Sequence, residues 1–289
     1  MVDMANKRSS MLLGLVLAIL PMGFVAMAGG TNVYPWLEGR AAKRCIARDI
    51  QCPDGFARTV VKTGSFADWL RNLPLKESGA KILNFDGSVK PNQLFHAAVI
   101  DIDTGKKNLQ QCADAVIRLR AEYLFSLSQY DAIEFTFTNG NPAPFSRWRA
   151  GYRPSLSGNV VRWERTDKPD TSYRNFRAYL DTVFMYAGTA SLSRELEAVR
   201  DIGQIQIGDV FIHGGAPGHA VIVLDMAVNK KGEKAFMVGQ SFMPAQDMHV
   251  LRNLHLPSLA PWYEIGSGER IQTPEWEFAS SELKRFKNP

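Results

Sequence analysis

Residues 217–225 read PGHAVIVLD, and in this stretch His219 directly precedes an unbroken apolar run. Apolar runs of this length after a Pro-Gly turn are typical of buried strands. A second run, KAFMVGQ at 234–240, follows after the turn-like segment NKKG at 229–232. Two strands joined by so short a connection pair antiparallel, so the sequence predicts a buried hairpin.

The hairpin brings the histidine close to an amide. If His219 lies opposite Gln240, the same face also pairs Asp225 with Lys234, which is a favourable opposite-charge pair. A register shift of one residue would turn Gln240 to the other face, whereas an even shift would leave it diagonal to His219. We therefore expect the amide of Gln240 to meet the imidazole of His219 at the open end of the hairpin.

A long helix is predicted to begin after Asn108, with Gln111 in its capping box. Cys112 lies in its first turn, where free N–H groups and the helix dipole favour a thiolate. A small cysteine that fills a core position is the alternative. Thiol chemistry needs a base to take the proton and a third group to orient that base. Cys112, His219 and Gln240 are therefore the candidate nucleophile, general base and orienting residue. Cys112 should be alkylated readily at a pH below about 8.5, the pKa of a free thiol.

Strands and helices alternate along the rest of the chain in an order typical of the α+β class. Strands are predicted at 94–102, 133–138 and 208–212, and helices at 173–187, 192–200 and 279–287.

The first 28 residues have the pattern of a signal peptide. A basic pair, Lys7-Arg8, precedes an apolar run at 11–25 and the sequence Ala-Met-Ala at 26–28. A retained membrane anchor is the alternative, because the run approaches the length of a span. We predict cleavage after Ala28 and export to the periplasm or medium, with no stable membrane span afterwards. Residues 29–289 should then form a single α+β domain.

The charge bears on the class of partner, and the cysteine content bears on disulfide formation. The net charge of +5 comes from 34 basic and 29 acidic residues that are interleaved, so no basic tail indicates a nucleic-acid partner. Cys45 and Cys52 are close in sequence and are predicted to form a disulfide in an oxidising compartment, which leaves Cys112 free.

Two further groups are weaker candidates. Trp148, Arg149, Tyr152 and Arg153 offer stacking surface and cationic donors for a sugar or a peptide carboxylate, and a structural Trp-Arg stack is the alternative. The acids at 101 and 103 mimic a metal motif but are better explained as alternating residues at a strand end. We expect neither a metal nor a cofactor.

Several motifs carry a resemblance to known families: QQCADAVIRLRAEYL, FTNGN, GDVFIHGG, PGHAVIVLDMA, QSFMPAQ and TPEW. Over most of residues 50–287 they resemble a family of bacterial secreted proteins, the domain of unknown function 4846, which implies no established activity. The segments around Cys112, His219 and Gln240 more distantly resemble papain-like cell-wall hydrolases of the NlpC/P60 and CHAP types. In those enzymes an Asp usually precedes the cysteine, whereas here the residue is Gln111.

The papain-like resemblance implies a helix packed on an antiparallel sheet, here with extra helices and an N-terminal extension. It also implies a cysteine hydrolase that acts on an amide or ester by acyl transfer. The predicted export suggests a small-molecule or peptide substrate derived from the cell wall. A non-catalytic envelope protein that binds a ligand on the same scaffold is the alternative.

Overall fold

The computed structural model describes residue 1 and residues 33–265 and 270–287. The predicted signal peptide, from its second residue onward, lies outside the described residues. The described residues from 33 onward belong to one compact unit. In the part of the chain that is described, no helix has both the length and the apolar character needed to cross a membrane.

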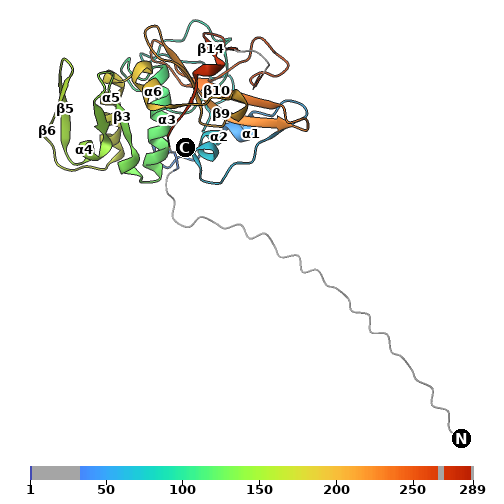
Figure 1. Cartoon of the computed structure of the whole chain (residues 1–289), viewed down its shortest axis with the longest axis horizontal. Coiled ribbons are helices and arrows are strands. Elements are labelled where there is room, and N and C mark those ends of the chain that lie inside the picture. Colours follow the sequence, from blue (N-terminus) through green and yellow to red (C-terminus); the bar gives the residue numbers. More distant parts are fainter. Residues whose placement is uncertain (2–32, 266–269, 288–289) are drawn as a thin grey trace. The chain divides into compact units, whose positions relative to one another are not determined.

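A large antiparallel sheet forms one side of the compact unit (Figure 1). Its strands are β1 (Phe56–Arg58), β2 (His96–Val99), β7 (Glu197–Ala198), β8 (Val210–His213), β9 (His219–Asn229), β10 (Lys234–Gln240), β11 (His249–Leu251), β12 (Tyr263–Glu264) and β15 (Leu283–Arg285). The main order is β2-β11-β10-β9-β8-β15-β7, while β1 pairs with β9 and β12 pairs with β10. The predicted hairpin is therefore the centre of the sheet, as expected for its two apolar runs.

The register of the hairpin differs from the prediction. The expected pairing assumes an unbroken ladder with His219 opposite Gln240, whereas an irregularity lies between Met237 and Val238. Met237 lies opposite Asp225, and β9 continues past Asp225 to its end four residues later. The predicted pair of Asp225 with Lys234 is wrong, because buried Asp225 instead pairs with two arginines from other elements.

The central helix α3 (Cys112–Ser126) packs on β9 and separates the sheet from a second group of elements (Figure 1). Its N-cap is Gln111, whereas the sequence places the cap at Asn108. The Asp114 carboxylate accepts the Gln111 backbone N–H at 3.0 Å, which closes the first turn. Asn108 has another role, because its side-chain oxygen accepts the N–H of Ala245 at 2.8 Å.

The other elements complete an α+β fold. The helices are α1 (Ile46–Asp49), α2 (Phe66–Arg71), α4 (Phe145–Arg149), α5 (Tyr173–Tyr186) and α6 (Thr189–Glu195), with short 3-10 turns at Pro35–Leu37, Tyr130–Ala132, Ile202–Gln204 and Ser280–Glu282. Three small hairpins pair β3 (Glu134–Thr136) with β4 (Pro142–Pro144), β5 (Tyr152–Ser157) with β6 (Val160–Arg165), and β13 (Arg270–Gln272) with β14 (Glu277–Ala279). The helix predicted at 279–287 is wrong, because β15 in that segment pairs with β8 and β7.

Candidate functional site

His219 and Gln240 meet as predicted. Nε2 of His219 lies 2.7 Å from Oε1 of Gln240, and both side chains are buried. The observed register places Gly239 opposite Ile222, so Gln240 reaches His219 diagonally across the two strands. Gly218 precedes the histidine in a crowded turn, where a β-carbon would lie 2.5 Å from the carbonyl oxygen of Gly215. The position before His219 therefore requires glycine.

A carboxylate fixes the orientation of the Gln240 amide. Nε2 of Gln240 donates to Oε2 of Glu275 at 2.7 Å, and Glu275 forms an ion pair with Lys90 at 2.6 Å. Because the amide nitrogen is held by Glu275, its oxygen must face His219 and accept from Nε2–H. The imidazole is thereby held in the tautomer with an unprotonated Nδ1.

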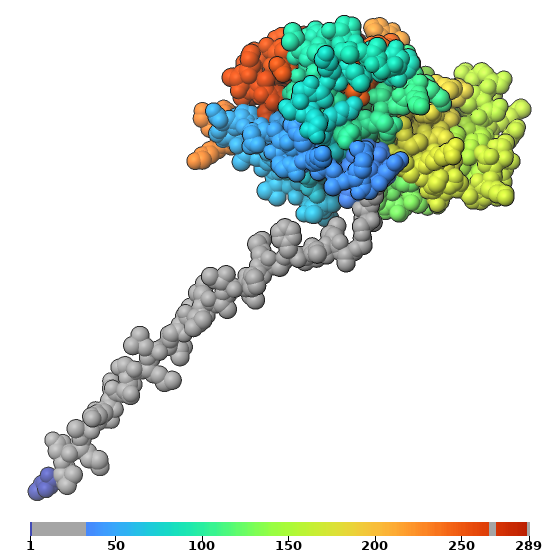
Figure 2. All heavy atoms as spheres, turned by 180° about the vertical axis from the view of Figure 1, so that it is seen from behind, coloured from blue at the N-terminus to red at the C-terminus, as the bar shows by residue number. Residues whose placement is uncertain are grey.

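Lys90 and Glu275 belong to the candidate site, although the sequence did not predict them there. Glu275 lies in the TPEW motif, and this is the signal in the sequence that could have drawn attention to it. No local sequence pattern links Glu275 to Lys90, which is 185 residues away along the chain. Figure 2 shows the C-terminal segment in red beside segments of the first half of the chain, and this contact brings the pair together.

Aromatic rings enclose the imidazole. The rings of Phe242, Trp276 and Phe278 lie with their centroids 5.0, 5.5 and 5.9 Å from that of His219. Burial among these rings lowers the pKa of His219 to about 4, against the effect of the bond to Gln240, which raises it. The ring is therefore uncharged at neutral pH.

Cys112 is the first residue of α3, and it is 9% exposed. Burial raises the pKa of its thiol to about 11, and the nearby Asp114 adds to this effect. The backbone N–H groups of Ala113, Ala220 and Cys112 itself act in the opposite direction by donating toward the sulfur. The expected resting thiolate is therefore wrong, because loss of hydration outweighs the stabilisation by the helix N-terminus.

The contact with Ala220 is informative about the site as a whole. Ala220 is the residue after His219, so the start of β9 and the start of α3 lie against each other at the thiol. The arrangement brings together a thiol, an imidazole with a defined tautomer, and free N–H groups of a helix N-terminus. No hydrogen bond joins the Cys112 and His219 side chains among the described residues.

Residues 46–285 match the model of the family described as domain of unknown function 4846. The chain belongs to this family. No curated protein and no solved structure matches it. The family match spans every residue of the candidate site, from Lys90 to Glu275, and it carries no activity with it.

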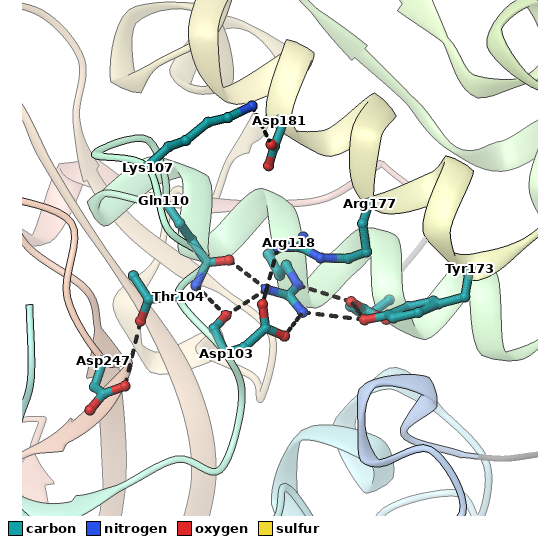
Figure 3. Close-up of polar contacts among 10 residues, drawn as sticks. Asp103, Thr104, Lys107, Gln110, Arg118, Tyr173, Arg177, Asp181 and Asp247 are labelled. Atoms are coloured by element: carbon teal, nitrogen blue, oxygen red, sulfur yellow. Dashed lines mark hydrogen bonds and ion pairs between the residues drawn. The ribbon is translucent and has the colours of Figure 1, made fainter. Parts of the chain in front are cut away.

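A buried charge network supports the start of α3 in this family member (Figure 3). The guanidinium of Arg118 donates to Oδ1 of Asp103 at 2.8 Å, to Oε1 of Gln110 at 2.7 Å and to Oε1 of Glu122 at 2.9 Å. Asp103 is thus an ion-pair partner of Arg118, and the Gln110 side chain is engaged by the same guanidinium. Among the described residues, no group of three or more His, Cys, Asp or Glu side chains is arranged to hold a metal ion.

The predicted substrate-binding residues do not converge on His219. Trp148 is buried and donates from Nε1 to Oδ1 of Asn175 at 2.9 Å. The guanidinium of Arg153 stacks over the Trp148 ring at 4.0 Å, and Arg149 pairs with Asp131 at 2.8 Å. The Arg153–Trp148 contact is the Trp-Arg stack of the alternative interpretation, and substrate binding by these residues stays a prediction. Tyr152 opens the β5–β6 hairpin, which Figure 1 shows on the far side of α3 from the sheet.

The three thiols are free in the structure. Cys45 caps α1, and Cys52 lies after that helix, where burial raises the pKa of its thiol. The bond between Cys45 and Cys52 is thus absent from this structure, and it stays a prediction for the protein in an oxidising compartment.

Proposed function

We propose that this protein is a papain-like cysteine hydrolase that acts on an amide or ester. The observation that carries the proposal is the packing of α3, which begins at Cys112, on β9, which begins at His219, the partner of Gln240. A nucleophile at a helix N-terminus next to an oriented imidazole is the arrangement that acyl transfer requires.

Both reacting groups are uncharged at rest, which defines the mechanism. As the sulfur of Cys112 forms a bond with the carbonyl carbon, Nδ1 of His219 takes the S–H proton. The Gln240 oxygen then stabilises the imidazolium through Nε2–H, and the N–H groups of Cys112 and Ala113 face the oxyanion. The imidazolium returns its proton to the leaving amine or alcohol as the bond to the carbonyl carbon breaks. Water, deprotonated by the same nitrogen, then attacks the carbonyl carbon of the thioester. The carbon–sulfur bond breaks, the acid leaves, and the imidazolium returns the proton to the Cys112 sulfur.

The substrate is proposed from the predicted export as a peptide or amide derived from the cell envelope. The alternative function, a non-catalytic envelope protein that binds a ligand, is favoured by one observation. Cys112 is buried with a raised pKa, as expected for an inert core thiol.

An acylation experiment separates the two functions. Purified protein is mixed with p-nitrophenyl acetate at pH 7.5, and acetyl transfer to Cys112 is followed by intact mass and peptide mapping. His219→Ala should slow acetylation by about 10²- to 10⁴-fold, the usual contribution of a general base. Gln240→Ala should have a smaller effect, because this residue orients the base without carrying the proton.

Cys112→Ala and Cys45→Ser are the matched thiol controls. Acetylation should disappear in the first and persist in the second. Equal acetylation rates in the wild type and His219→Ala would remove the base from the mechanism and favour the ligand-binding function.

A further inference from the structure

A groove runs along β2, the terminal strand of the large sheet. Two hollows, of about 440 and about 370 Å³, share Ala97 and Arg252 in their linings. The segment 77–81 bounds the first hollow, while Pro257 and Pro261 line the second. The groove lies outside the network around His219, so the proposed chemistry does not explain it.

Positive charge lines this groove. Arg252 and Lys81 are exposed and form no ion pair with any residue in the described part of the chain. Arg44, also in the lining, is already paired with Asp49 at 2.9 Å. Glu77 is the carboxylate of the lining, so the basic side chains outnumber the acidic ones. The groove is therefore complementary to an anionic ligand.

The backbone of β2 is open beside these charges. Lys76 donates its N–H to the carbonyl oxygen of Val99 at 2.9 Å, which covers one end of the strand. The chain then turns away at Gly79, whose φ is +77°. β2 has β11 on one edge and no strand of the described chain on the other, and Ala97 of β2 is exposed and lines both hollows. Unpaired backbone at a sheet edge is a template for an added strand.

We propose that this groove binds an extended acidic peptide, which pairs with β2 at Ala97 and places carboxylates on Lys81 and Arg252. Main-chain hydrogen bonds to a strand edge provide affinity in this mode of binding, and the side-chain contacts provide specificity. Side chains of an extended peptide alternate between its two faces. Acidic residues at every second position would therefore lie on one face and contact the basic side chains together.

The test uses a fluorescein-labelled peptide in which Glu alternates with Thr, and a matched peptide in which Lys replaces Glu. Anisotropy titrations with the purified full chain measure both affinities. Binding of the Glu peptide should exceed binding of the Lys peptide. The double variant Lys81→Glu/Arg252→Glu should bind the Glu peptide about tenfold more weakly. The control Lys230→Glu/Lys231→Glu reverses the same amount of charge in the exposed turn after β9 and should bind normally.

Ala97→Pro tests the strand addition separately, because it removes the N–H that would bond the peptide. It should weaken binding while the thermal unfolding transition is retained. Equal affinity for both peptides, or equal loss in both double variants, would overturn the proposal. If Ala97→Pro binds the Glu peptide as tightly as the wild type does, and polyphosphate displaces the peptide fully, then the peptide binds by charge alone. That result would overturn strand addition.

Discussion

The Gln240 side chain is held from both ends. Its oxygen accepts from His219, and its nitrogen donates to Glu275 at 2.7 Å and approaches Nε2 of His249 at 3.4 Å. His249 can accept there because its Nδ1 is engaged by the carbonyl oxygen of Asp247 at 2.9 Å. Each polar atom of this buried amide thus has a partner, which is what makes its orientation unique.

Replacing this amide should lower the pKa of His219 further. In Gln240→Leu the volume is nearly kept, but the acceptor that favours the charged imidazole is lost, so the pKa should fall below its value of about 4. Nitrogen-15 NMR of the ring measures both the pKa and the tautomer. The wild type should show Nε2–H, and the variant should lose this preference.

Gln206→Leu is the control, because Gln206 is exposed and its side chain forms no hydrogen bond with a histidine among the described residues. A pKa of His219 that rises toward 6.5 in Gln240→Leu would contradict the assignment of Gln240 as the stabilising acceptor.

At the scale of elements, β9 is tied to its neighbours by a buried carboxylate. Asp225 pairs with Arg58 of β1 at 2.7 Å and with Arg71 of α2 at 2.6 Å. The Asp225 side chain is fully buried, so its two partners replace the hydration that it loses on folding. These pairs fix α2 and β1 against the central strand of the sheet.

Asp225→Asn should destabilise the protein by about 3–5 kcal/mol, because it leaves two guanidinium groups without their counterion in a buried position. Urea denaturation measures this change in the free energy of unfolding. Asp167→Asn is the matched control, since the Asp167 side chain is 54% exposed and its pair with Arg153 should contribute at most about 1 kcal/mol. Similar losses in the two variants would refute the role given to Asp225.

The elements also show where local sequence is a poor guide. The helix predicted at 279–287 has a pattern that fits a short amphipathic helix, yet β15 in this segment pairs with β8 and β7. Strand pairing with distant parts of the chain competes with the local preference for a helix. In a short segment the tertiary contacts outweigh that preference. The start of α3 differs for a simpler reason, because the Asn108 side-chain oxygen accepts from Ala245, while Asp114 closes the first turn on the Gln111 N–H.

Over the whole molecule, two buried histidines couple stability to pH. Burial lowers the pKa of His219 to about 4 and that of His249 to about 3, from 6.5 in the unfolded chain. Between these values the unfolded state binds more protons than the folded state. The free energy of unfolding should therefore fall as the pH falls below 6.5, by about 1.4 kcal/mol per pH unit for each histidine.

Thermal or urea unfolding of the wild type and His249→Gln from pH 7 to pH 4 measures the contribution of His249 to this pH dependence. The variant should lose less stability on acidification. Asp114, whose pKa burial raises to about 8, acts in the opposite direction, so the difference between the two proteins is the informative quantity. Parallel curves would show that His249 titrates normally.

Hydrophobic periodicity and helix capping act over a few residues, so the amino-acid sequence is enough to predict the apolar hairpin, the helix that carries Cys112 and the order of cysteine, histidine and amide. The fold brings Lys90 and Glu275 to Gln240, pairs Asp225 with Arg58 and Arg71, and raises the pKa of the Cys112 thiol by burying it. Ion pairs between distant segments and the loss of hydration on burial depend on what the completed fold packs around a group, and no local pattern encodes that.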